Sequence, residues 1–554
     1  MENIMKLEQP AKKHQGVKLI SLIYEYISNL KYIIFLLLSL VSSYTYFLTN
    51  YSVSIDDFCG DRYYFGQLFA QGRMTSTLIR HIFGLINNNY WFIDFIGIVF
   101  LGLSAIVFCI VFDRVIRTKS MIPQVIFSCL LVTSPLHTEI FSYTGCTLAV
   151  GGGFFLVSCA LWFVLNYIES KQKKNLVFAS VMVALVSSWY ESLVVVYFCA
   201  VFAVLILTYI SDDYKEKITI KSIFTNGMIF AVPLIAGLVL EFAISFPVSK
   251  LVNFTGLLGS ANTSGWMTGE SVGIFRIVRA WMLKYVLACG WYLPITLFVV
   301  SLVVALVLAV YYCKKKKSPL IVLLFAGLYL GVIILSLIFG NCAPYRTAQV
   351  VIFFTAFIYF LLAHSLCGHN CKLLFRGACV ILAYFIILQI TNTNYWFNAD
   401  YQRYQEEKSV VMQVGNTLYQ NYDINKPVVF VGDYELSDNI KELTCMKVDS
   451  IPYKLTSILH INSAINNGND GRYSYHIQDT NGISFIKWST SAFLINDNKP
   501  NTELLKFFSY CGYSDIKQGT LKQYNEAKKL SEAMPEWPQK GSVKDNGEYI
   551  IVNF

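Results

Sequence analysis

The residues best suited to chemistry lie in one short stretch, Ser54-Ile-Asp-Asp-Phe, which holds the adjacent carboxylates Asp56 and Asp57. Adjacent side chains point to different faces of any regular structure, so we expect one aspartate to act as a general base and the other to orient it or to pair with an arginine. Arg62 and Arg73 follow, and a guanidinium offers a bidentate fork to phosphate. The alternatives are a solvated acidic turn and arginines that contact lipid headgroups.

Two further candidates stand between apolar stretches. Glu191, in Trp189-Tyr190-Glu191-Ser192, is a single carboxylate between two apolar helices, where it should face water, a partner or a substrate. Arg346 is the one basic residue of Asn341-Cys-Ala-Pro-Tyr-Arg-Thr347 and is suited to a lipid phosphate. The simpler interpretations are a carboxylate at an exposed loop tip and an interfacial anchor. Weaker candidates lie at or near outer helix ends: His137, Glu139 and Glu241.

Several other patterns do not support a site. The spacing of His364, Cys367, His369 and Cys371 is not that of common zinc motifs, and we expect no metal site. The sequence has no Walker motif, no dinucleotide fingerprint and no D-x-D. Most of the 14 cysteines fall in apolar runs or short turns, which indicates packing. Cys445 and Cys511 could pair if their compartment is oxidising.

These residues must be positioned by membrane helices. Of 554 residues, 55% are hydrophobic and 14% charged, and mean hydropathy is +0.50, which excludes soluble, secreted, fibrous and disordered classes. Apolar runs near 20 residues predict about eleven spans. They lie at 32–48, 91–112, 122–138, 147–168, 176–189, 192–210, 227–248, 291–313, 319–339, 349–366 and 374–391.

The charge distribution predicts the orientation. With the N-terminus inside, the cytoplasmic segments carry 20 Lys and Arg and the opposite segments 8. The basic excess therefore needs no nucleic-acid partner, and an odd number of spans leaves the tail outside. The short stretch 176–210 is predicted to be a pair of short helices whose turn lies in an outward-facing recess. One long tilted helix is the alternative, but it would place Lys314–Lys317 outside.

We therefore expect a polytopic α-helical membrane protein with a C-terminal extracytoplasmic α/β domain. Residues 1–31 form a cytoplasmic amphipathic segment, 32–391 the membrane domain with outer loops 50–90 and 250–290, and 392–554 the outer domain. The local predictions are an interfacial helix at Phe275–Ala288, strands at Pro427–Asp433 and Glu548–Asn553, and helices at Ser409–Tyr419 and Asn501–Cys511.

The joint order of these motifs resembles a known family. Asp56-Asp57, Arg62 and Gly72-Arg73 in the first outer loop resemble the polytopic O-antigen glucosyltransferases of Gram-negative bacteria, the serotype-converting Gtr enzymes of phage-derived three-gene clusters. The hairpin turn at Tyr190-Glu191-Ser192, the Pro344-Tyr345-Arg346 loop and the outer tail fit the same picture.

The resemblance implies a GT-C-like inverting enzyme of the inner membrane with its active site in the periplasm. It would pass a sugar, typically glucose, from undecaprenyl phosphate to lipid-linked O-antigen, without a cofactor. Asp56 or Asp57 would be the base and Glu191 would orient the acceptor or a catalytic side chain. The lipid phosphate would be bound by residues of the outer loops: Arg62, Arg73, Arg346, Tyr190 and Tyr345. A flippase and a donor synthase of the same cluster are possible partners.

Two other functions compete with glycosyl transfer. A lipid-linked oligosaccharide flippase would carry charges inside several helices and would lack a large outer domain. An O-antigen polymerase acts on the same face with outer-loop arginines, but its large feature is usually an internal loop. If the outer domain is only a binding module, Asp56 and Asp57 are dispensable.

Overall fold

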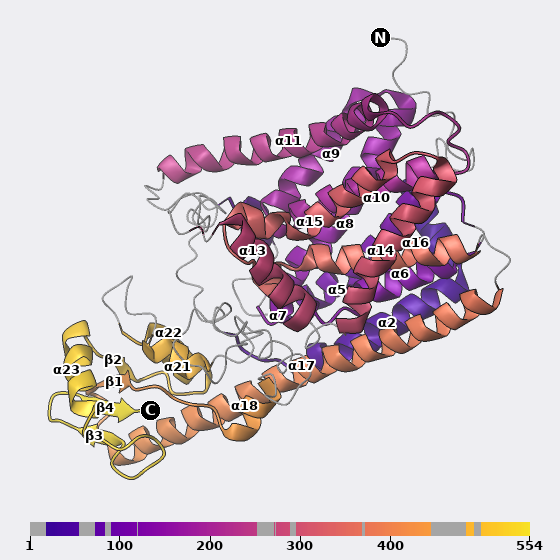
Figure 1. Ribbon diagram of the computed structural model, residues 1–554. Coiled ribbons are helices and arrows are strands. Elements are labelled where there is room, and N and C mark those ends of the chain that lie inside the picture. The colour runs from indigo at the N-terminus through magenta and orange to yellow at the C-terminus, as the bar shows by residue number, and fades with distance from the viewer. Residues whose placement is uncertain are drawn as a thin grey trace.

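A bundle of long apolar helices makes up most of the protein, and one helix extends from it to a smaller C-terminal unit (Figure 1). The computed structural model describes residues 18–54, 72–82, 90–118, 120–143, 145–251, 271, 273–288, 295–367, 372–444, 484–491 and 500–554.

Nine of the described helices are long and apolar enough to cross a membrane. They are α2 (Leu30–Thr49), α5 (Tyr90–Val115), α8 (Cys146–Ser170), α10 (Ser192–Ile210), α11 (Ile220–Leu251), α14 (Ile295–Lys316), α15 (Leu320–Phe339), α16 (Gln349–Cys367) and α17 (Lys372–Asn421). Three shorter helices accompany them: α1 (Leu19–Ser28), α6 (Ile122–Val132) and α9 (Lys173–Ser187). Each of the eleven predicted spans coincides with one of the nine or with α6 or α9, while the number that cross a membrane stays a prediction.

The stretch 176–210 is a helical pair, so the alternative of one long tilted helix is wrong. α9 and α10 are separated by the turn 188–191. Three segments predicted to be cytoplasmic meet at one end of the bundle: Lys315 Nζ lies 3.2 Å from Asp212 Oδ1, and Arg117 Nε lies 3.3 Å from Asp213 Oδ2. We call this the Lys315 end.

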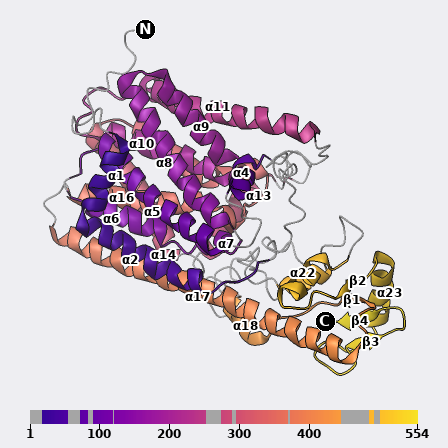
Figure 2. The same cartoon turned by 180° about the vertical axis from the view of Figure 1, so that it is seen from behind.

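Short helices gather at the opposite end, which we call the Arg346 end. α4 (Met74–Ile82), α7 (His137–Phe141) and α13 (Ile274–Trp281) lie there (Figure 2). α13 continues into a π-helical turn, η5 (Met282–Ala288), so the helix predicted over Phe275–Ala288 is confirmed. A 3-10 turn, η7 (Tyr345–Thr347), precedes α16.

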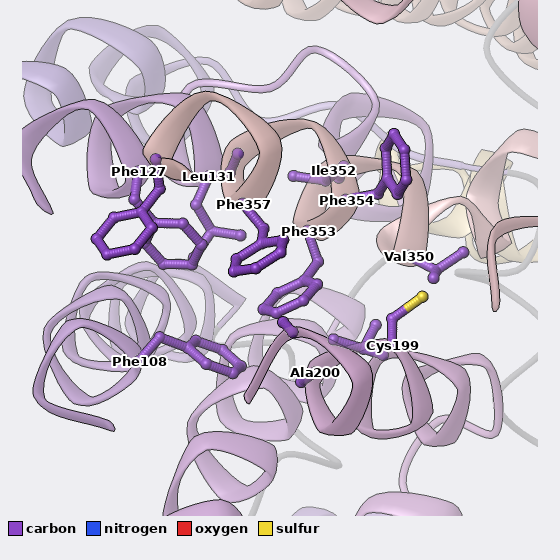
Figure 3. Close-up of a cluster of buried hydrophobic side chains, with 14 of the residues drawn as sticks. Phe108, Phe127, Leu131, Cys199, Ala200, Val350, Ile352, Phe353, Phe354 and Phe357 are labelled. Carbon is purple, nitrogen blue, oxygen red and sulfur yellow. The ribbon is translucent and has the colours of Figure 1, made fainter. Parts of the chain in front are cut away.

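The core of the bundle is aromatic and centres on α16, which packs against α6 and α10. The Phe353 ring lies 5.1 Å from the Phe108 ring and 6.0 Å from the Phe127 ring (Figure 3). All three side chains are fully buried. Because α16 directly follows η7, this packing also fixes the start of α16 at the Arg346 end.

Three successive glycines, Gly151, Gly152 and Gly153, let α8 approach its neighbours closely. A Cβ at Gly151 would lie 1.9 Å from the carbonyl oxygen of Gly97 in α5. A Cβ at Gly152 would lie 2.5 Å from the Trp189 ring, and one at Gly153 would lie 2.2 Å from Leu193. The backbones of α5 and α8 therefore touch, and the turn 188–191 rests on α8.

The predicted boundary at residue 391 does not coincide with the end of a helix. α17 is one helix of 50 residues, and the helix predicted over Ser409–Tyr419 is its last part. The sequence from Ala378 to Val414 contains neither Gly nor Pro, so nothing interrupts the hydrogen-bond ladder where hydropathy falls.

The C-terminal unit is a four-stranded mixed sheet in the order β2-β1-β4-β3 with helices on both faces. Its elements are β1 (Pro427–Val431), α18 (Asp438–Thr444), α21 (Phe485–Ser491), α22 (Thr502–Tyr510), β2 (Lys517–Gln518), α23 (Leu521–Ser531), β3 (Val543–Asp545) and β4 (Ile550–Asn553). β1 pairs in parallel with β2 and β4, and β3 is antiparallel to β4. The strands predicted near 427 and 550 and the helix predicted near 501 are confirmed.

Candidate functional site

The loop that carries Arg346 is held on one side by η5. The Tyr285 hydroxyl donates to the carbonyl oxygens of Ala343 and Pro344 at 3.0 and 2.9 Å. The Tyr345 hydroxyl donates to the carbonyl oxygen of Lys284 at 2.6 Å, and Lys284 Nζ lies 4.7 Å from the centre of the Tyr345 ring. Tyr345, which was predicted to bind the lipid phosphate, is only 2% exposed, and its side chain holds the loop in place.

The same loop is held on the other side by the turn 188–191. The Tyr190 hydroxyl donates to the carbonyl oxygen of Arg346 at 3.2 Å. Gln349 Nε2 donates to the same oxygen at 2.6 Å, and the Ser192 hydroxyl donates to Gln349 Oε1 at 2.8 Å. The backbone of Arg346 is therefore fixed from α10 and α16 together.

The Arg346 side chain is half-buried and lies against Tyr143, which follows α7. Its Nη1 donates to the Tyr143 hydroxyl at 3.0 Å, and its guanidinium carbon lies 5.9 Å from the centre of the same ring. α7 itself is buried, and His137 and Glu139 are both fully enclosed. A guanidinium held at the end of an apolar bundle can bind a phosphate that belongs to a lipid.

Arg73 approaches this cluster from α4. Burial raises the pKa of Tyr190, and the positive charges of Arg346 and Arg73 act on it in the opposite direction. The raised pKa keeps the hydroxyl protonated and able to donate. The Thr75 and Ser188 hydroxyls lie 2.6 Å apart and join α4 to the same turn. Arg73, the residue directly before α4, is exposed.

Glu241 of α11 also reaches the start of α4. Gly72 has a φ of +81°, and a Cβ there would lie 2.7 Å from Glu241 Oε1. The same oxygen accepts from the Ser245 hydroxyl at 2.8 Å. Position 72 therefore requires glycine for its backbone conformation and for this contact. Glu241 is half-buried and lies beside Gly72 of the Gly72-Arg73 pair, a contact that the sequence does not predict.

The predicted site residues thus divide into two groups. Tyr190, Arg346 and Arg73 come together at the Arg346 end, and half-buried Glu191 is the last residue of the turn 188–191, directly before α10. The predicted residues outside the described part of the chain are Asp56, Asp57 and Arg62, so their roles stay predictions.

Tyr143 and Gln349 belong to the site although the sequence does not mark them as candidates. Both are uncharged, and neither lies in a recognisable motif, so only the packing of α7 and α16 against η7 reveals them. Of the two cysteine patterns, His364, Cys367 and Cys511 are described, whereas His369, Cys371 and Cys445 lie outside the described residues. The described residues contain no group of three or more His, Cys, Asp or Glu that could hold a metal ion.

Comparison with known proteins decides the family. The family described as Glucosyl transferase GtrII matches residues 45–363. The chain belongs to this family. This GtrII-type chain is therefore a glucosyl transferase, and the resemblance to the Gtr enzymes is confirmed. No curated protein and no solved structure matches it.

The matched range includes the candidate site. It runs from the last turns of α2 to α16, so it includes Asp56, Asp57 and the whole cluster around Arg346. It ends before α17 and the C-terminal unit. With nine described helices apolar enough to span a bilayer, the GtrII transferase is a membrane-embedded enzyme.

Proposed function

We propose that this glucosyl transferase moves glucose from undecaprenyl phosphate to lipid-linked O-antigen at the periplasmic face of the bacterial inner membrane. The observation that carries the proposal is the Arg346 cluster. Hydrogen bonds from Tyr190 and Gln349 fix the backbone of Arg346. Its half-buried guanidinium therefore lies at one end of an apolar bundle, where a lipid phosphate and a sugar can meet.

The Arg346 end lies opposite the basic segments. Lys315, Arg117 and their acidic partners gather at the Lys315 end, which the excess of Lys and Arg assigns to the cytoplasm. An enzyme whose site opens on the other side has no access to cytoplasmic nucleotide sugars. A lipid-linked donor supplies both the leaving group and the location.

The proposed reaction is an in-line displacement. A carboxylate, Asp56 or Asp57, removes the proton from an acceptor hydroxyl as its oxygen attacks the anomeric carbon. The bond between that carbon and the phosphate oxygen breaks, and undecaprenyl phosphate leaves with the electron pair, so the configuration inverts. Arg346, with Arg73 or Arg62, stabilises the charge on the phosphate. Glu191 orients the acceptor or a catalytic side chain.

The test is transfer of [14C]glucose from undecaprenyl phosphate to a lipid-linked O-antigen acceptor by purified full-length protein. We expect label on the acceptor with wild type and none with the double variant Asp56→Asn/Asp57→Asn. The matched control is Asp212→Asn/Asp213→Asn, a second pair of adjacent aspartates, whose surface ion pairs at the Lys315 end contribute little. Full activity of the first double variant would exclude the proposed base.

The same assay separates this function from its rivals. A wild-type protein that binds the lipid but transfers no glucose would favour an O-antigen polymerase, a flippase or another sugar donor. Single variants then assign the base: the aspartate whose change to asparagine abolishes transfer, with the protein still in the membrane, removes the proton.

A further inference from the structure

A fully buried arginine of α17 connects the start of the first outer segment to the C-terminal unit. The Arg403 side chain is 1% exposed. Its Nε and Nη2 donate to Asp400 Oδ1 at 3.1 and 2.9 Å, and its Nη1 donates to Glu407 Oε2 at 2.5 Å. Its Nη2 also donates to the carbonyl oxygen of Val53 at 2.6 Å.

The two carboxylates extend the connection in both directions. The Ser52 hydroxyl donates to Asp400 Oδ2. Glu407 Oε1 accepts from the Ser484 hydroxyl at 2.9 Å and from the Ile486 N–H, at the start of α21, at 3.0 Å. One polar cluster therefore joins residues 52–53, α17 and α21.

Apolar packing surrounds the cluster and follows the same path. Val53 is 2% exposed and belongs to the core of the C-terminal unit, together with Tyr404 and Phe507. The Tyr51 ring lies 6.4 Å from the Tyr404 ring. The start of the first outer loop, directly after α2, is thus packed into the C-terminal unit before the chain reaches Asp56.

Stability alone does not explain three buried charges. Removing ions from water is costly, and well-packed apolar residues of similar size often stabilise a fold as well or better. What apolar residues cannot supply is a donor that fixes the direction of the Val53 carbonyl. The cluster therefore fixes the position of the backbone at Val53.

We propose that Arg403 is a positioning residue for glucosyl transfer, through which the C-terminal unit holds the segment that leads to Asp56 and Asp57. The inference rests on the proposed function, since its consequence for the reaction depends on those aspartates. Val53 precedes Asp56 by three residues, so its position limits the reach of the Asp56 carboxylate. Arg403 lies beyond the matched residues 45–363, so the family match assigns it no role.

The first test compares two buried arginines. Arg403→Met removes the donor to Val53. Arg114→Lys is the matched control, because Arg114 is 4% exposed, donates to both oxygens of Glu169 and lies at the Lys315 end. In the glucose-transfer assay we expect Arg403→Met to lower kcat about tenfold or more with KM for the lipid donor little changed, because misplaced groups cost rate more than binding. Arg114→Lys should leave kcat within about twofold of wild type by the same argument.

A second variant tests whether a low kcat of Arg403→Met reflects only a loss of folding. The triple variant Arg403→Met/Asp400→Asn/Glu407→Gln removes all three charges, so no charge is left buried without its partner. The amides still accept from Ser52 and Ser484. We expect its melting temperature to recover towards wild type while kcat stays low. A kcat that recovers together with the melting temperature would overturn the positioning role.

Hydrogen exchange of the backbone amides gives a readout that does not need activity. We expect the peptide over residues 50–54 to exchange faster in Arg403→Met than in wild type or Arg114→Lys. If the exchange over residues 50–54 is unchanged in Arg403→Met and the wild type transfers glucose, the positioning role of Arg403 is wrong and the proposed function stands. Faster exchange in a protein whose wild type transfers no glucose would overturn the proposed function, and with it the role of Arg403 in transfer.

Discussion

The Tyr190 hydroxyl donates to the carbonyl oxygen of Arg346 at 3.2 Å and joins two segments that are 156 residues apart in the sequence. Tyr190 belongs to the turn between α9 and α10, and Arg346 to the turn before α16. Because Gln349 donates to the same oxygen, the backbone that carries the guanidinium has two donors. The site is therefore built from two turns, one between α9 and α10 and one directly before α16.

The guanidinium of Arg346 should matter for its shape as well as its charge. We expect Arg346→Lys to lower kcat/KM by about 10²-fold, because an ammonium cannot offer a phosphate two parallel donors and the lost donor acts on a developing charge. The measurement is glucose transfer from undecaprenyl phosphate at varied donor concentration.

The control is Arg279→Lys, an exposed arginine of α13 at the same end of the bundle, which should leave transfer unchanged. An Arg346→Lys enzyme as active as wild type would rule out phosphate binding by Arg346.

Tyr190 acts on Arg346 through the backbone, so its removal should have a smaller effect. Tyr190→Phe keeps the ring and loses one hydrogen bond, which contributes about 1 kcal/mol. We expect kcat/KM to fall about fivefold, the rate equivalent of that energy. Tyr384→Phe, on the exposed face of α17, is the control. If Tyr190→Phe abolished transfer completely, Tyr190 would instead touch the substrate.

The sequence predicted the helices well because most are long apolar runs with polar ends. The pair α9 and α10 followed from the short length of the stretch together with the distribution of Lys and Arg. It also predicted Arg346 as a candidate, since it is the one basic residue of a short loop, while Tyr190 became a candidate through the family resemblance. It could not predict that they meet, because that contact depends on how α10 packs against α16.

Two features of α17 were not predicted, for physical reasons. A fall in hydropathy near residue 391 indicates where the apolar part of the chain ends, but nothing in the sequence interrupts the helix there, and α17 continues to Asn421. The Asp400–Arg403–Glu407 cluster was missed because charges at i, i+3 and i+7 on a helix usually indicate a solvated face. Only the packing of Val53 and α21 over that face makes it buried.

The contact between α5 and α8 should tolerate no side chain. We expect Gly151→Ala to destabilise the protein by about 1–3 kcal/mol, because its methyl group would overlap the Gly97 carbonyl and force the helices apart. The measurement is the melting temperature of the protein in detergent, followed by size-exclusion chromatography.

Gly377→Ala is the matched control for this change. Gly377 lies in α17 and has open space around its Cβ position, so alanine should be neutral or slightly stabilising there. Equal melting temperatures of the two variants would show that the α5–α8 contact does not need glycine.

An ion pair at the edge of the sheet should make the C-terminal unit sensitive to acid. Lys426 Nζ lies 2.6 Å from Asp545 Oδ2, and the hydrogen bond from Lys426 followed by that from the Gly547 N–H lowers the pKa of Asp545. A carboxyl whose pKa is lower in the folded protein contributes stability above its unfolded pKa, about 3.9, and loses it as the pH falls through the folded pKa. Asp545→Asn should therefore melt below wild type at pH 7.

The difference in melting temperature between the two proteins should narrow as the pH falls from the unfolded pKa, about 3.9, towards the lower pKa of Asp545 in the folded protein. Melting curves of both full-length proteins between pH 3 and pH 7 measure this difference. Asp438→Asn is the control, because that carboxylate is fully exposed and 4.0 Å from its nearest cation, Lys441. A difference between wild type and Asp545→Asn that stays constant over this range would mean that the carboxylate acts through its shape and not through its charge.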